Sequence, residues 1–220
     1  NTICMTTNDP SGFKATGATI FSTANYILVY TKDKRSKPLK KVFIQKTHDT
    51  AYKKVLKDRS QPCNTWEWEN IGDIVARKLG FESAKMARKE LESSFDNEIA
   101  AFAVQNADHV FRTAAIGGGA AKKRRTTIQA SKLNREKVLT HPGEDVQDFY
   151  ILNGEQIVFY DRRLIEIDGA KVPGEMLTDV WTDISWTGIA SEGGVEFKNG
   201  KKPERLIQRV LELSTNLGDL

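Results

Sequence analysis

The sequence has few of the residues that build metal centres or disulfide frameworks. Among 220 residues there are two cysteines, three histidines and six prolines. Cys4 and Cys63 stand in unlike contexts, so free thiols and a reducing cytoplasm are expected. No spacing among His48, His109 and His141 indicates a metal site or a proton relay. No apolar run approaches the about 20 residues that a membrane helix needs, so no membrane partner is expected.

What is present is an ordinary globular composition with a mild positive charge. Hydrophobic residues make up 39% of the chain and charged residues 28%, enough for one large domain or two small ones. The net charge of +4 permits a nucleic-acid partner without demanding one. The chain begins with Asn rather than Met, so a fragment or a processed product is expected.

The most informative stretch is the last forty residues, a loop rich in Trp and Gly followed by a helix pattern. Pro203 suits the first turn of a helix, where its missing N–H is not needed. Asn216 and Gly218 are residues that end helices. Apolar residues at helical spacing predict one buried face, made of Leu206, Ile207, Val210 and Leu213.

Two stretches of the sequence resemble adenine-specific DNA methyltransferases, above all the modification subunits of type III restriction systems. In that family a W-x-D-I element, an E-G-G turn and a G-K-K-P-E helix precede the strand whose glycine-rich loop cradles S-adenosylmethionine. The matching residues here are Trp181, Asp183, Ile184, Glu192, Gly193, Gly194, Gly200, Lys201, Lys202, Pro203, Glu204, Leu206, Ile207, Arg209, Val210 and Leu211. A second likeness, to the last strand of the catalytic sheet, is carried by Tyr26, Ile27, Leu28, Val29, Tyr30 and Lys32.

The resemblance implies a division of the chain into three parts. Residues 1–33 would be the last strands of the catalytic domain, with a boundary at the charged linker 33–38. Residues 34–178 would form the target-recognition domain, and 179–220 would lead to the cofactor strand. An α+β fold follows, in which a mixed helical and antiparallel-strand domain is flanked by pieces of a Rossmann-like sheet.

The same resemblance implies S-adenosylmethionine as cofactor in the intact enzyme, with Lys202 and Pro203 as the cofactor-side residues. It also implies double-stranded DNA, a restriction subunit and a second methyltransferase subunit as partners. The family's Asp/Asn-Pro-Pro-Tyr/Phe loop and Phe-x-Gly-x-Gly loop are both missing from this sequence. No residue is therefore assigned a catalytic role, and the chain alone is expected to be inactive, with these loops before residue 1 and after residue 220.

Local patterns predict the remaining elements. Residues 2–7 and 25–32 are expected to be strands, the second buried on both faces, with a turn at 8–12 and a mobile loop at 12–23 between them. Helices are expected over 49–57, from a cap at Asn64 to Gly80, and over 83–109 with a break near 93–94. An Asn-Gly turn at 153–154 predicts a hairpin of 149–152 with 156–160, followed by a third strand at 163–167. The helices on either side of Gly80 are expected to pack as an ordinary pair, with a DNA-reading helix-turn-helix as the alternative.

The segment 112–142 has a strong excess of positive charge. It holds eight basic residues and one acidic residue, Glu136, a balance of +7 that exceeds the charge of the whole chain. Residues 116–125 are expected to form a flexible loop, because three glycines precede four cations. In a methyltransferase, phosphate is the natural partner of such a run, whereas a solvated surface is the ordinary alternative. The residues predicted to bind DNA are Lys122, Lys123, Arg124, Arg125, Lys132, Arg135 and Lys137.

The sequence thus supports the DNA-recognition part of a site-specific adenine-N6 methyltransferase of a bacterial restriction-modification system. The alternative is a stand-alone DNA-binding or protein-interaction module without catalysis.

Overall fold

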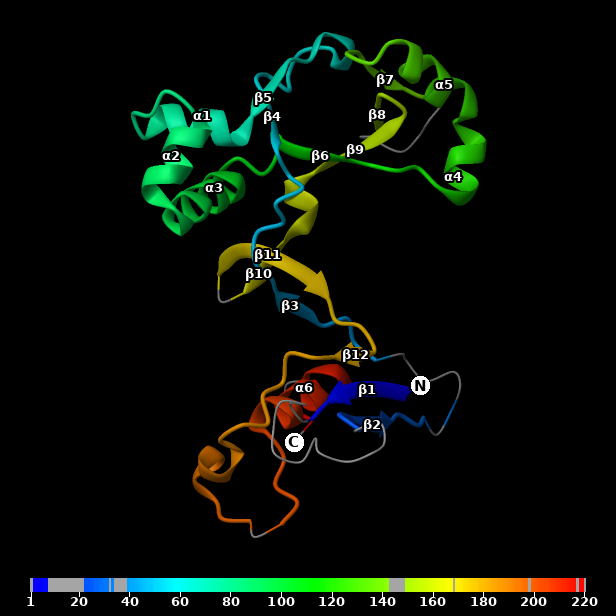
Figure 1. Cartoon of the computed structure of the whole chain (residues 1–220). Helices are drawn as coiled ribbons and strands as arrows, with labels where there is room; N and C mark the ends of the chain where they lie inside the picture. Colours follow the sequence, from blue (N-terminus) through cyan, green and yellow to red (C-terminus); the bar gives the residue numbers. More distant parts are fainter. Residues whose placement is uncertain are drawn as a thin grey trace. The chain divides into compact units, whose positions relative to one another are not determined.

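A computed structural model describes residues 2–7, 22–31, 33, 39–142, 149–167, 169–197, 199–216 and 218–219 (Figure 1). The chain forms two compact units. The flanking unit comprises 1–44 and 176–220, and the central unit comprises 45–175. Helices and largely antiparallel sheets occur together, so the predicted α+β class is confirmed. The predicted turn at 8–12, most of the loop at 12–23 and most of the linker at 33–38 lie outside the described residues.

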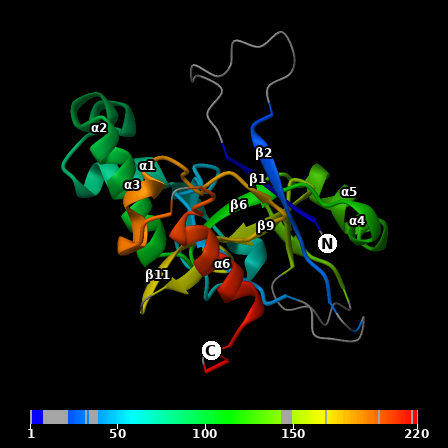
Figure 2. The ribbon, with the colours of Figure 1, turned by 90° about the horizontal axis from the view of Figure 1, so that it is seen from below.

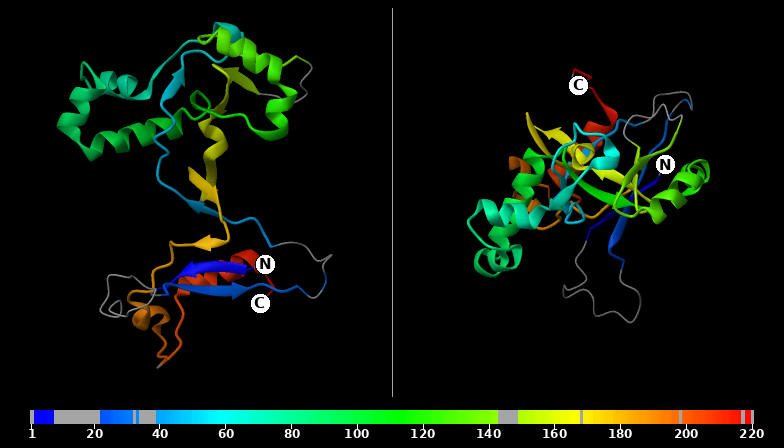
Figure 3. Two further views of the ribbon diagram at one scale, coloured as in Figure 1. Left: turned by 45° about the vertical axis from the view of Figure 1, so that its right-hand side comes forward. Right: turned by 90° about the horizontal axis from the view of Figure 1, so that it is seen from above.

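The flanking unit has a three-stranded sheet in the order β12-β1-β2. Strand β1 (Thr2–Thr6) is central, pairing in parallel with β12 (Val180–Trp181) and antiparallel with β2 (Ala24–Leu28). Helix α6 (Glu204–Ser214) packs against this sheet (Figure 3, left). The two ends of the sequence therefore share one core, made of Ile3, Met5, Trp181, Ile184 and Leu206.

Strand β2 corrects the prediction of a strand buried on both faces. It ends at Leu28 and pairs within the described residues with β1 alone. Tyr26 and Leu28 are 67% and 58% exposed. Successive side chains of a strand point to opposite faces of the sheet, and these two lie on the face away from the core. Ile27 and Val29 do pack against that core.

Helix α6 corrects the predicted apolar face. Leu206 and Arg209 are buried, whereas Ile207 is 49% and Val210 is 36% exposed. The helix turns a charged residue inward because the buried Arg209 guanidinium pairs with the Asp183 carboxylate, which is 42% exposed. Pro203 is the residue just before the helix rather than part of its first turn, and the helix ends at Ser214 with Thr215 as its cap.

The central unit is built on a six-stranded antiparallel sheet in the order β5-β4-β6-β9-β8-β7. Its strands are β4 (Lys54–Leu56), β5 (Trp68–Asn70), β6 (Val110–Ala114), β7 (Val138–Thr140), β8 (Tyr150–Leu152) and β9 (Glu155–Phe159). Helices α1 (Ile71–Lys78), α2 (Ala84–Leu91) and α3 (Ser93–Gln105) lie at one end of this sheet. Helices α4 (Gly118–Lys123) and α5 (Arg125–Leu133) lie at the other end, as Figures 1 and 2 both show.

Each end of the sheet has its own core. The three-helix end buries Ile71, Val75, Phe95, Ile99 and Phe102 together with Tyr52 and Tyr160. All three helices contribute to this one cluster, so the helices on either side of Gly80 pack against a common core. The other end is aromatic, with Trp66, Phe111 and Phe159 buried beside Tyr150.

Two helix predictions in the central unit are wrong. Residues 49–57 contain a turn, in which Asp49 accepts a hydrogen bond from the Ala51 amide, and then β4. Sheet pairing on both sides of β4 outweighs the local helical pattern. Asn64 lies in the short 3-10 helix Cys63–Thr65, and the cap of α1 is Asn70, whose Oδ1 accepts from the Gly72 N–H at 2.8 Å.

The remaining helix predictions hold. Gly80, with φ of +84°, follows the end of α1. The helical region after Ser83 is interrupted at Glu92, next to the predicted break.

The predicted hairpin is confirmed. Its turn has φ of +49° at Asn153 and +81° at Gly154, the left-handed pair that a type I′ turn requires. The predicted third strand exists as β10 (Leu164–Ile167), but it leaves the hairpin after the 3-10 helix Tyr160–Arg163. It pairs instead with β11 (Ala170–Met176), in a separate sheet ordered β10-β11-β3, where β3 is Phe43–Gln45.

Candidate nucleic-acid interface and cofactor-side segment

The cationic segment forms two helices instead of the predicted flexible loop. Gly118, with φ of +55°, lies where α4 begins, and α5 follows directly after Arg124. The three glycines favour a flexible loop, but the residues that follow them, Ala120 to Lys123, are strong helix formers. In the structure the helix formers prevail. The cations therefore project from an ordered helical scaffold.

The inward face of this scaffold is polar, and each of its side chains has a specific partner. Arg124 is 6% exposed and stacks its guanidinium carbon 3.7 Å from the centre of the Phe149 ring. Thr127 Oγ1 lies 2.7 Å from His141 Nδ1. Ser131 Oγ accepts from the Gly154 N–H at 3.2 Å. These contacts fix the start of α5 beside residues 141 and 149, which adjoin β7 and β8, and its end against the turn of the β8–β9 hairpin.

The outward face presents the positive charge. Lys122, Arg125 and Lys132 are exposed and line one groove of about 600 Å³. The other residues that line it come from α4, α5, the approach to α4 and the hairpin turn, and they include Ala121, Ile128, Gln129, Asn153, Gly154 and Glu155. The Lys132 stem packs on Gly154, where an added Cβ would lie 2.6 Å from Cε.

The seven residues predicted to bind DNA thus divide into three groups. Three line the groove, and Lys123, Arg135 and Lys137 are exposed near it in sequence without lining it. Arg124 is different, because its buried side chain supports the scaffold and is turned from solvent. Sequence reasoning missed Gln129 and Asn153 as groove residues, since only the hairpin pairing brings the turn beside α5.

In the flanking unit, an ion pair between the buried Arg209 and the partly exposed Asp183 organises the segment that carries the resemblance. Arg209 is fully buried and donates two hydrogen bonds to Asp183, at 2.8 Å to Oδ1 and 2.6 Å to Oδ2. Its guanidinium carbon also lies 5.1 Å from the centre of the Trp181 ring. Such bidentate pairing fixes the helix relative to the strand. Trp181, Asp183 and Arg209 all belong to the motifs that carry the resemblance. Their membership of those motifs is the sequence feature that could have indicated the ion pair.

The E-G-G turn is held by two neighbouring side chains. Lys201 Nζ donates to the carbonyl oxygens of Ala190, Glu192 and Val195 at 2.6 to 2.8 Å. Glu192 Oε2 accepts from the Glu204 N–H at 2.7 Å, which satisfies one free amide at the start of α6. Lys201 and Glu192 therefore have structural roles in this segment.

The two residues predicted to contact the cofactor lie in different environments. Lys202 is exposed, with Nζ 5.7 Å from the centre of the Trp186 ring, whereas the Pro203 side chain is fully buried. Lys202 also lines a largely apolar groove of about 520 Å³ formed with Val195, Phe197, Ile207 and Leu211. Of the pair, Lys202 alone can meet a ligand in this conformation.

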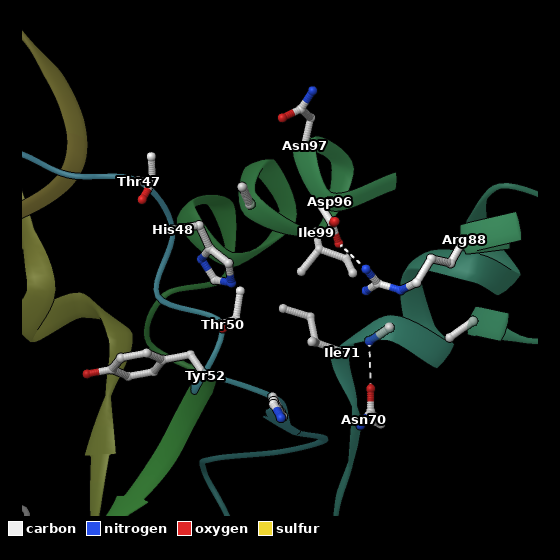
Figure 4. A pocket seen from close by; sticks show the side chains of 14 residues that line it. Thr47, His48, Thr50, Tyr52, Asn70, Ile71, Arg88, Asp96, Asn97 and Ile99 are labelled. Atoms are coloured by element: carbon white, nitrogen blue, oxygen red, sulfur yellow. Dashed lines mark hydrogen bonds and ion pairs between the residues drawn. The ribbon is translucent and has the colours of Figure 1, made fainter. Parts of the chain in front are cut away.

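A further cavity of about 660 Å³ lies at the three-helix end of the central unit (Figure 4). Arg88 and Asp96 form an ion pair of 2.7 Å at its wall. His48 Nδ1 lies 2.8 Å from the Tyr160 hydroxyl. Burial lowers the pKa of His48 and raises the pKa of Tyr160 to about 12, so the tyrosine hydroxyl stays protonated near neutral pH.

The described residues show neither a metal cluster nor a membrane span. No group of three or more His, Cys, Asp or Glu side chains among them could hold a metal ion. No helix in this part of the chain is long and apolar enough to cross a membrane.

Comparison with known proteins finds one informative similarity. The chain is 32% identical over 80 residues to a probable type III restriction-modification enzyme, the HindVI Mod subunit of Haemophilus influenzae. These residues are 36% of this chain and 11% of that protein, so the chain spans a small part of this relative's length. No protein-family model and no solved structure match the chain. Part of the chain is therefore similar to a modification subunit, in agreement with the resemblance of its motifs.

Proposed function

We propose that this chain is the DNA target-recognition part of a site-specific adenine-N6 DNA methyltransferase of a type III restriction-modification system. The observation that carries the proposal is the α4–α5 face, where three exposed cations converge on one groove. The similarity to a modification subunit supports the choice of DNA over other anionic partners. The central unit would position the duplex, and the flanking unit would belong to the catalytic domain.

The cations would bind phosphates rather than bases. Lys and Arg side chains on a helix surface neutralise backbone phosphates and fix the register of a protein on the duplex. Arg124, which stacks on Phe149, would hold the helices in place for this contact. DNA binding by this face is therefore expected to depend steeply on salt.

In the intact protein, S-adenosylmethionine would supply the methyl group. Lys202 is the exposed cation of the cofactor-side segment, and its ammonium is suited to the cofactor carboxylate. Pro203 would set the start of α6. The sequence has neither catalytic nor cofactor loop, so the chain alone is proposed to bind DNA without methylating it. A restriction subunit and a second modification subunit remain proposed partners, and the proposed compartment is the cytoplasm.

The second candidate is a stand-alone DNA-binding module. It shares the α4–α5 face and differs in giving the flanking unit no catalytic partner. Adding the missing catalytic segments of a modification subunit would distinguish the two. Restored methylation supports the first candidate, whereas DNA binding without any gain supports the second.

Binding to unrelated duplexes over a range of salt concentrations tests the proposed face. The double variant Lys122→Ala/Arg125→Ala is expected to bind all duplexes more weakly. Its slope of log affinity against log salt should fall by about 2, which is about 1 for each phosphate contact removed.

Lys85→Ala/Lys89→Ala provides the matched control. These lysines are exposed on α2, at the opposite end of the same sheet (Figure 2), and their removal costs the same two charges. The control should retain most of the wild-type affinity and slope. Equal losses in both variants would mean that net charge alone drives binding, and an unchanged α4–α5 variant would refute the proposed face.

A further inference from the structure

Two amide side chains line the cationic groove. Gln129 is one turn after Arg125 and just under one turn before Lys132, and Asn153 is the first residue of the hairpin turn. Both are exposed and line the groove with the three cations. Neither side chain has a hydrogen-bond partner among the described residues, so both amide groups can bind a ligand.

The turn that carries Asn153 is fixed against α5. The Gly154 N–H donates to Ser131 Oγ, and the Lys132 stem covers the Gly154 Cα. An amide on the turn therefore keeps its position relative to Gln129. Sites of this kind are preorganised, because little side-chain and loop freedom is lost on binding.

The residue types fit base edges better than they fit phosphate. Asn and Gln amides pair with adenine in the major groove, where they accept from N6 and donate to N7. Glu155, which also lines this groove, would repel a phosphate but can accept from the cytosine N4 amine. Three cations line the same groove as these three side chains, so phosphate contacts and base contacts could be made together, as they are on a duplex.

We propose that Gln129 and Asn153 are base-reading residues that enter the major groove and select adenine-thymine pairs in the DNA target. This inference rests on the proposed function, since it places DNA in the α4–α5 groove. It assigns sequence choice to α5 and the β8–β9 turn. Lys122, Arg125 and Lys132 supply binding that does not depend on sequence.

A competing explanation for Asn153 is its backbone conformation alone. Asn tolerates a φ of +49°, and the type I′ turn favours Asn-Gly whatever the turn contacts. The substitution Asn153→Gly separates the two explanations. Glycine adopts the same backbone angles without strain but removes the amide side chain.

The test is selection from a pool of duplexes randomised over a short central window, using the full chain at one moderate salt concentration. Wild-type protein is expected to enrich adenine-thymine pairs at defined positions. Asn153→Gly and Gln129→Ala should each relax the preference at one position by about 5- to 150-fold. Their affinity for unselected duplexes should fall by a smaller factor than the preference at that position.

Asn97→Ala serves as the control, since Asn97 is an exposed amide on α3, away from the groove. It should leave the selected sequence unchanged. Unchanged preferences in both groove variants, or no preference in the wild type, would overturn the base-reading assignment while leaving phosphate binding intact. Loss of all binding in Lys122→Ala/Arg125→Ala, measured on the same pool, would still support the proposed function, and wild-type protein that binds no duplex would refute it.

Discussion

Helices α5 and α6 both bury polar side chains but differ in the side chains that they expose. Helix α5 turns the polar residues Thr127 and Ser131 inward and presents cations to solvent. Helix α6 buries Arg209 and leaves Ile207 and Val210 largely exposed. In both helices the inward polar groups have named partners, so specific hydrogen bonds can place a polar side chain on the buried face.

We propose that the difference between the outward faces is functional. The outer face of α5 is charged, which suits an anionic partner such as DNA. On α6, Ile207 and Leu211 line the largely apolar groove that also contains Lys202. In the proposed methyltransferase, α5 would face the duplex and α6 would face the catalytic domain.

The largest effect of losing an ion pair is expected where α6 buries Arg209. Asp183→Ala removes the carboxylate, itself 42% exposed, from the fully buried Arg209 guanidinium. We expect the free energy of unfolding to fall by about 2 to 3 kcal/mol, less than for a pair buried on both sides. Urea denaturation measures this. Glu212→Ala is the control, because both side chains of its ion pair with Arg205 are partly exposed, and the pair is worth at most about 1 kcal/mol. Equal losses in the two variants would show that Asp183 does not anchor the helix.

A smaller effect is expected at the inward face of the α4–α5 scaffold. Arg124→Ala removes the stacking on Phe149 and should lower the free energy of unfolding by about 1 to 2 kcal/mol. Its neighbour Arg125 is exposed, so Arg125→Ala should change the same quantity by less than about 0.5 kcal/mol. Thermal or urea unfolding of the two variants measures both changes. A larger loss in Arg125→Ala than in Arg124→Ala would contradict the assignment of Arg124 to the inward face.

The smallest effect is expected on the outer face of α6. Ile207→Ser should lower the free energy of unfolding by about 1 kcal/mol, since the side chain is 49% exposed and about half of its apolar surface is buried. Leu206→Ala, one residue away at 5% exposure, should cost about 2 to 4 kcal/mol. Similar costs at both positions would mean that Ile207 is buried in solution.

The sequence predicted the elements that have strong local signals. Asn153-Gly154 predicted the hairpin turn, and Ser83 and Gly80 marked helix ends, because turn and cap chemistry act within a few residues. Strand β4 was missed, since its state depends on pairing with β5 and β6, far along the chain. The helices α4 and α5 were missed because a run of three glycines predicts a flexible loop, whereas the helix formers that follow it determine the structure.

The sequence predicted which residues form the candidate site but not how their side chains are arranged. The excess of cations in 112–142 identified the residues of the α4–α5 face without showing which of them face solvent. The burial of Arg124 follows from Phe149, and the burial of Arg209 follows from Asp183, which is 26 residues away. Gln129 and Asn153 came together only through the docking of α5 on the hairpin.

The central claim is that DNA binds the α4–α5 face of the central unit. Hydrogen exchange of the chain with and without a duplex locates that contact directly. The account predicts slowed exchange in residues 118–133 and 153–155, with α1 and α2 unchanged. Slowed exchange confined to α1 and α2, or no change anywhere at a saturating duplex concentration, would contradict it.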